Sequence, residues 1–133
     1  MSDRDHAIAM LETARGDLAA LQGMQHPALS DHDFFSDAVF GFHAQQAVEK
    51  TLKAWLSLKG VRYPHTHDLM ALLDALADSG ENVAALLDLV DLNLFAVQYR
   101  YETLEEEEEK MDRDQLQDRI QHVFNHVQQL IKA

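Results

Sequence analysis

Apolar residues recur at spacings of three and four along most of the chain, and no stretch of any length alternates apolar with polar side chains. The first spacing is typical of an amphipathic α-helix, and alternation would indicate a half-buried strand. Glycine and proline, which interrupt helices, number only 5 and 2 among 133 residues. The pattern therefore predicts an all-α fold, and the length predicts a single domain over residues 1–133.

Five helical segments are expected. The first runs from Asp5 to Leu21 and the second from Phe34 to Lys59, and a short third helix follows Thr66, its expected N-cap. The fourth runs from Asn82 to Tyr101 and the last from Asp114 to Lys132. We expect an up-and-down four-helix bundle, with the short third helix as an addition.

The fourth segment carries two apolar stripes. The stripe expected to face the core comprises Val83, Leu86, Val90, Leu94, Val97 and Tyr101. At about 100° per residue, a second stripe lies on another side of the helix and comprises Leu89, Leu92, Phe95, Ala96 and Tyr99. A helix with two apolar faces either lies fully in the centre of the bundle or meets another chain. In a bundle this small we favour the second chain, and we predict a homodimer with the second stripe at its interface.

The charge excludes some functions. Lysine and arginine number 11 against 23 acidic residues, which gives a net charge of −12. Such a body repels polyanions, so we expect no stable nonspecific nucleic-acid binding, whereas a small nucleotide or a basic protein could use a local patch. The chain has no cysteine, which excludes disulfides and thiolate zinc sites. We see no signal peptide or run of ~18 apolar residues, and we expect a cytoplasmic protein with no membrane contact.

Histidine pairs are the first chemical candidates. His65 and His67 flank the start of the third helix, where they are either a metal or phosphate contact or ordinary loop side chains. His122 and His126 share a face of the last helix, but Val123 stands where a zincin motif has glutamate. The first pair has no third ligand nearby in the sequence, and the second pair falls toward the polar side of its helix, so we expect no metal site.

Cations in the middle of the chain are the second candidates. Lys50 and Lys53 lie on the face of the second helix away from Trp55, and Arg62 and Arg100 follow. In an acidic protein they form either a small phosphate-recognition patch or ordinary surface side chains.

Two segments, in this order and spacing, resemble a known family. Residues 42–56 read FHAQQAVEKTLKAWL and are followed by Gly60 and by THDL at 66–69, and residues 96–101 read AVQYRY. This resembles the HEPN family, the higher-eukaryote and prokaryote nucleotide-binding domain, over nearly the whole chain. The resemblance implies a helical bundle, usually dimeric, often paired with a minimal nucleotidyltransferase in a two-gene toxin–antitoxin or defence module. It also implies that some members bind nucleotides and that others are metal-independent ribonucleases.

The ribonuclease branch carries an arginine, four to six further residues and a histidine, since arginine stabilises phosphate charge while histidine moves a proton. In the best positional match, residues 92–99, Leu92 replaces that arginine and Val97 replaces that histidine. The bare spacing recurs from Arg62 to His67 and from Arg119 to His126, outside the family's usual position. The ends of these two stretches are the candidate catalytic residues if the protein is an enzyme.

We therefore expect a dimeric, non-catalytic HEPN module that binds a nucleotide (ATP or GTP) or a minimal nucleotidyltransferase and needs no cofactor. The candidate nucleotide-binding residues are Lys50, Lys53, His67, Arg100 and Tyr101. The alternatives are a metal-independent ribonuclease toxin and a ligand-free structural adaptor dimer.

Overall fold

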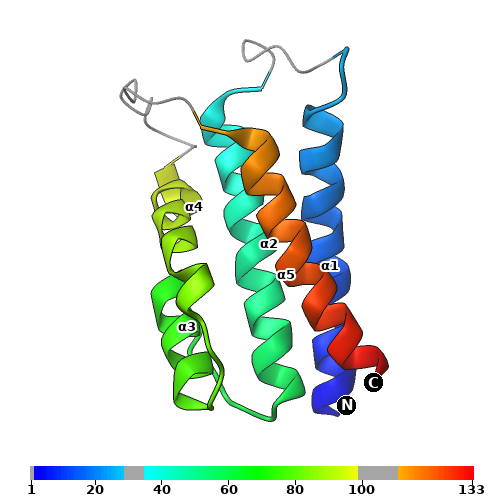
Figure 1. Cartoon of the computed structure of the whole chain (residues 1–133), viewed down its shortest axis with the longest axis vertical. Helices are drawn as coiled ribbons and strands as arrows, with labels where there is room; N and C mark the ends of the chain where they lie inside the picture. Colours follow the sequence, from blue (N-terminus) through cyan, green and yellow to red (C-terminus); the bar gives the residue numbers. More distant parts are fainter. Residues whose placement is uncertain (1, 29–34, 99–110) are drawn as a thin grey trace.

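The computed structural model describes residues 2–28, 35–98 and 111–133, and every regular element in these ranges is helical. The elements are α1 (Asp3–Met24), α2 (Asp37–Leu58), α3 (Leu69–Asp78), the 3-10 helix η1 (Ala84–Leu94), α4 (Phe95–Gln98) and α5 (Arg113–Lys132). Successive long elements run in opposite directions, and α3 is the short addition (Figure 1). The predicted all-α class is confirmed.

Short polar residues begin the helices and set their bounds. Ser2 and Asp5 form a capping box at α1, while the side chains of Ser36 and Asp112 cap α2 and α5. Each cap satisfies a backbone N–H that the first helical turn leaves without a partner. Gly60, with φ of 72°, turns the chain after α2, as a C′ glycine commonly does.

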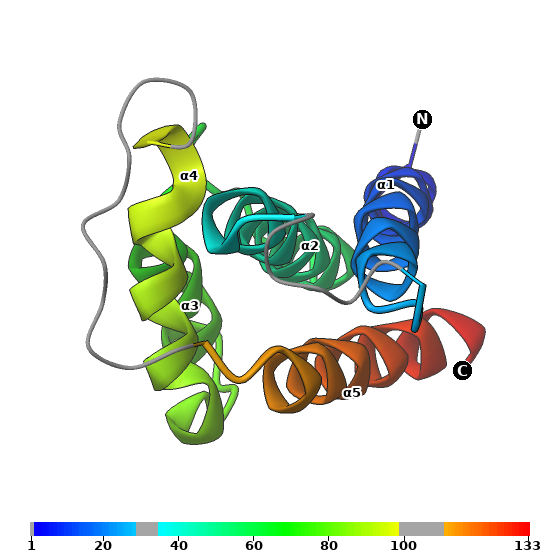
Figure 2. The ribbon, with the colours of Figure 1, turned by 90° about the horizontal axis from the view of Figure 1, so that it is seen from above.

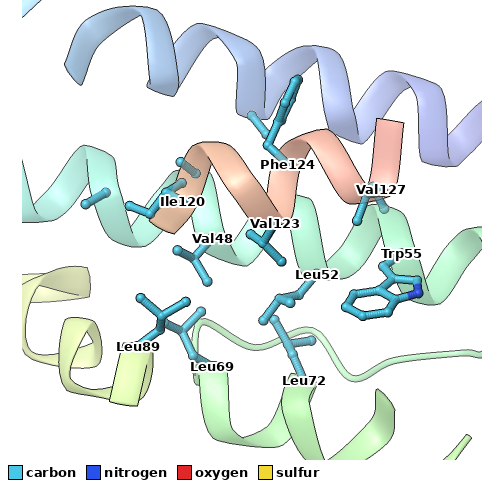
Figure 3. Packing of buried hydrophobic residues seen from close by; sticks show 14 of the residues in the cluster. Val48, Leu52, Trp55, Leu69, Leu72, Leu89, Ile120, Val123, Phe124 and Val127 are labelled. Atoms are coloured by element: carbon cyan, nitrogen blue, oxygen red, sulfur yellow. The ribbon is translucent and has the colours of Figure 1, made fainter. Parts of the chain in front are cut away.

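The core surrounds α2. Figure 2 shows α2 in the middle, with α1 and α5 on one side and α3, η1 and α4 on the other. In Figure 3, Val48 and Leu52 of α2 lie between Val123 of α5 and the leucines of α3 and η1, which include Leu69 and Leu89. From Asp37 to Leu58 every side chain is at least partly buried. Packing on two sides explains why α2 carries more apolar surface than one bundle face needs.

The prediction of a single fourth α-helix is wrong. The segment is a 3-10 helix, η1, followed by the single turn α4. A 3-10 helix completes a turn every three residues, so residues three apart share a face. The face that packs inward is spaced in this way and comprises Val83, Leu86, Leu89, Leu92 and Phe95. Of the stripe that we expected in the core, Val83 is buried and Leu86 and Val90 pack partly buried against the core, whereas Leu94 is 40% exposed.

Because η1 has a period of three residues, most of the expected dimer interface faces the chain's own core. Three of its members are buried in the chain's own core, namely Leu89, Leu92 and Phe95, at 2%, 5% and 6% exposure. Ala96 is half-buried, and Tyr99 lies outside the described residues. The argument that these side chains need a second chain therefore does not hold. The exposed large apolar residues of η1 are instead Leu87 and Leu94.

One smaller expectation, the N-cap of the third helix, is also wrong. Asp68, not Thr66, is the N-cap of α3, and its Oδ1 accepts a hydrogen bond from the Met70 N–H at 2.9 Å. The Thr66 hydroxyl accepts from the Asp68 N–H at 3.0 Å and so stabilises the turn before the helix. In α5, Ile131 is buried, whereas Leu130 is 37% exposed.

Candidate functional site

A carboxylate lies buried in the middle of α2. Glu49 is 3% exposed and stands one turn after Gln45 and one turn before Lys53. Gln45 Nε2 donates to Glu49 Oε1 and Lys53 Nζ donates to Glu49 Oε2, each at 3.1 Å. A charge is expensive to bury unless it is paired and hydrogen-bonded, and this row along one helix supplies both conditions.

The segment after α2 brings His67 to the same carboxylate. His67 Nδ1 lies 2.8 Å from Glu49 Oε1, and Gln45 Nε2 donates to the backbone oxygen of His67 at 3.0 Å. The side chain and the backbone of His67 are thus both held by α2. The side chain is nevertheless 66% exposed, although Nδ1 contacts a buried carboxylate.

The hydrogen bonds decide the protonation of Glu49. Burial by itself raises the pKa of Glu49, but hydrogen bonds from Gln45, His67 and Lys53 outweigh burial and hold the pKa below its ordinary value. Glu49 is therefore ionised at neutral pH and only accepts hydrogen bonds.

The start of α3 is also held by η1. Asn93 Oδ1 accepts from the Leu69 N–H at 2.9 Å, and Asn93 Nδ2 donates to Asp68 Oδ1 at 2.8 Å. The turn that carries His67 is therefore fixed between α2 and η1. We call the unit of Gln45, Glu49, Lys53 and His67 the α2–α3 junction.

Lys53, one of the residues of the α2–α3 junction, also packs against Tyr63. Its Nζ lies 5.7 Å from the centroid of the Tyr63 ring. The Tyr63 hydroxyl lies 2.8 Å from His6 Nε2 of α1. Of the expected nucleotide-binding residues, Lys53 and His67 are thus brought together through Glu49, and the loop before α3 is tied to both α1 and α2.

Lys50 makes its contacts elsewhere. Its Nζ donates to Asp17 Oδ2 of α1 at 2.8 Å, and His43 Nδ1 lies 3.0 Å from Asp17 Oδ1. Asp17 is 9% exposed. Lys50 and Lys53 are therefore each paired with a buried carboxylate, and they do not form a free cationic patch, which was one of the two alternatives.

The arginine and histidine of α5 have separate partners. Arg119 Nη1 donates to Asp88 Oδ2 at 2.8 Å, and Arg119 Nη2 donates to Asp88 Oδ1 and, at 3.1 Å, to the Ala85 oxygen. The Arg119 hydrogen bonds hold the pKa of Asp88 below its usual range. His126 instead packs edge-on against Trp55, with ring centroids 5.1 Å apart. Arg119 thus ties α5 to η1.

Three further candidates can be placed only in part. Arg62 is exposed in the loop between α2 and α3. Arg100 and Tyr101 lie outside the described residues. Within the ranges that the structure describes, no three histidine or acidic side chains gather in a way that could hold a metal ion. No helix in the same ranges is long and apolar enough to cross a membrane.

Sequence reasoning singled out His67 but missed Gln45 and Glu49, which hold it. The available signal was their spacing of one helical turn within α2, a helix with an unusually wide apolar surface. Gln45 and Glu49 belong to the first segment that carried the family resemblance, and His67 belongs to THDL at 66–69. The structure joins these two segments in one hydrogen-bonded unit.

The fold and the junction define an all-α bundle with a charged network buried behind an exposed histidine. A model of the HEPN domain matches residues 7–133, nearly the whole chain. The protein belongs to the HEPN domain family. Comparisons with curated proteins and with solved structures find no match.

Proposed function

We propose that this HEPN protein is a dimeric, non-catalytic module that binds a nucleotide at the α2–α3 junction and acts with a minimal nucleotidyltransferase in a toxin–antitoxin-like pair. The observation that carries the nucleotide part is the contact of buried Glu49 with exposed His67 at 2.8 Å. A buried charged network contributes little net stability compared with apolar packing. We infer that this network has a functional role, which is to hold the imidazole ring of His67 in a fixed position at the surface.

The surroundings of His67 support a small ligand. Arg62 is exposed in the same loop, so a cation stands close to His67 in the sequence of a protein whose net charge is −12. Such a local patch suits a nucleotide, whereas the acidic body disfavours a long polyanion.

Calorimetry with ATP and GTP tests nucleotide binding. We expect binding to the wild-type protein, and binding about 3- to 10-fold weaker in His67→Ala, the effect of one lost hydrogen bond. His65→Ala is the matched control, because it removes an exposed histidine two residues away in the same loop. No heat and no thermal stabilisation at millimolar nucleotide would remove this part of the proposal.

Dimerisation now rests on different side chains. Leu87 and Leu94 of η1 are 46% and 40% exposed, although large apolar groups usually gain from burial. We expect Leu87→Asp and Leu94→Asp to shift the protein from dimer to monomer in sedimentation experiments. Leu130→Asp in α5, at a site 37% exposed, should leave the dimer intact. A wild-type monomer at high concentration would contradict the dimer.

Copurification tests the partner. A minimal nucleotidyltransferase encoded beside this chain should form a complex with it that survives size exclusion. The adaptor alternative predicts the same complex with no effect of ATP, GTP or His67→Ala on any measurement. Binding data on the purified dimer therefore separate the two.

The second candidate function is a metal-independent ribonuclease, and one observation favours His67 within it. Glu49 at Nδ1 leaves Nε2 free to accept a proton from a ribose hydroxyl. Arg119 and His126 fit less well, because Asp88 and Trp55 already engage them. RNA cleavage in a chelator should then be lost in His67→Ala and kept in His126→Ala. An inactive wild-type protein would end this candidate.

A further inference from the structure

We infer that His67 recognises the nucleoside part of the ligand, through Nε2 acting as a hydrogen-bond acceptor, and that it does not contact the phosphates. The group it accepts from is a ribose hydroxyl or the exocyclic amine of the base. This inference rests on the nucleotide binding proposed above and assigns a role to one atom within it.

The first step concerns the donors around Glu49. Glu49 Oε1 accepts one hydrogen bond from Gln45 Nε2 and contacts His67 Nδ1, and Glu49 Oε2 accepts one from Lys53 Nζ. An ionised carboxylate has no proton to give, so the contact with His67 requires an N–H at Nδ1. In a neutral imidazole with the proton at Nδ1, Nε2 carries a lone pair.

The second step concerns what a lone pair can bind. Phosphate oxygens are themselves acceptors and find no donor at such a nitrogen, whereas hydroxyl and amine groups donate to it. The neighbouring lysines do not change this, because Lys53 is paired with Glu49 and Lys50 with Asp17. Arg62 is exposed in the same loop and supplies a cation for the phosphates.

The third step concerns rigidity. Glu49 holds the ring of His67, Gln45 holds its backbone oxygen, and Asn93 holds the two residues that follow. An acceptor fixed from three directions is preorganised, so a ligand loses little by meeting it. Because the ring is 66% exposed, water replaces a missing donor easily, and the discrimination is moderate.

Four nucleotides test the inference by calorimetry: ATP, 2′-deoxy-ATP, 3′-deoxy-ATP and purine riboside triphosphate, which lacks the exocyclic amine. We expect one analogue to bind the wild-type protein about 3- to 10-fold more weakly than ATP, and this identifies the donor group. The difference should vanish in His67→Ala and persist in His65→Ala. Equal binding of all four, or a difference that survives His67→Ala, overturns the inference and leaves nucleotide binding standing. If none of the four binds and GTP does not bind either, the proposed function is overturned and this inference with it.

A second measurement needs no ligand. Nitrogen NMR of the wild-type protein should show His67 as the Nδ1–H tautomer, while His65, exposed in the same loop, serves as the internal reference. An Nε2–H tautomer at His67 overturns the inference whatever the calorimetry shows. In Glu49→Gln the preference for Nδ1–H should weaken, because an amide can donate as well as accept.

Discussion

Gly41 of α2 is covered by the ring of Phe95, and replacing it tests how α4 packs. A Cβ built on Gly41 would lie 2.5 Å from Phe95 Cγ and 2.6 Å from each Cδ atom. Phe95 is 6% exposed, so its ring cannot move aside freely. Overpacking of this kind costs about 1–3 kcal/mol. Alanine is favoured over glycine inside a helix by about 1 kcal/mol, which offsets part of that cost.

Gly16 of α1 supplies the matched control. Nothing lies within 4 Å of a Cβ built there, so Gly16→Ala should stabilise the protein by about 1 kcal/mol. Gly41→Ala should lower the free energy of unfolding by up to about 2 kcal/mol. The two variants should thus differ by about 1–3 kcal/mol, the packing cost alone, in urea unfolding followed by circular dichroism.

A double-mutant cycle isolates the contact. On a Phe95→Ala background the ring is gone, and Gly41→Ala should stabilise the protein as Gly16→Ala does. If Gly41→Ala stabilises the wild-type protein as much as Gly16→Ala does, the ring does not lie over α2. The reasoning about α4 would then be refuted.

Three further changes test the site and its supports. The folded-state pKa of Glu49 is depressed, so its ionised form adds stability above the unfolded pKa, and this is lost as the pH falls through the folded pKa. Between about pH 7 and about pH 3, urea titrations should therefore show the wild-type protein losing more stability than Glu49→Gln, and equal losses would contradict the pKa argument. Arg113, 6% exposed, donates to Asp37 Oδ1 and to the Phe35 oxygen, so Arg113→Met should cost about 2 kcal/mol, and an unchanged unfolding midpoint would show that the pair is dispensable. Asp68→Ala removes the N-cap of α3 and should cost about 1 kcal/mol, whereas Asp68→Asn keeps an acceptor and should cost less, and an equal cost in both variants would argue against the cap.

The helices that pack against one another over long, regular stripes were predictable. In α1, Leu11, Ala14, Leu18 and Leu21 all lie in the core, as their spacing predicts. The start of α1 was placed only approximately, because its N-cap, Ser2, lies five residues before Ala7, the first buried apolar position of the helix. Helix ends depend on single side chains, and periodicity does not report them.

The period of the fourth segment was not predictable from its residues alone. Leu86, Leu89 and Leu92 are spaced by three, which fits one face of a 3-10 helix and also part of an α-helix. The intrinsic preference of these residues favours an α-helix, so the 3-10 conformation depends on contacts with the neighbouring helices. Two contacts hold this segment against its neighbours. The ring of Phe95 packs on Gly41 of α2, and the side chain of Asn93 accepts a hydrogen bond from the Leu69 N–H at the start of α3.

The residues by themselves determined the helical class, the positions of α1, α2 and α5, and His67 as a candidate, because periodicity and chemical type are properties of the chain order. Only the tertiary structure decided which apolar face of η1 is buried and that Glu49 stands behind His67. The physical reason is distance along the chain: Glu49 and His67 are 18 residues apart, and their contact exists only after Gly60 turns the segment back against α2. Local patterns report what each helix prefers, while burial and hydrogen bonding between helices settle which preferences are realised.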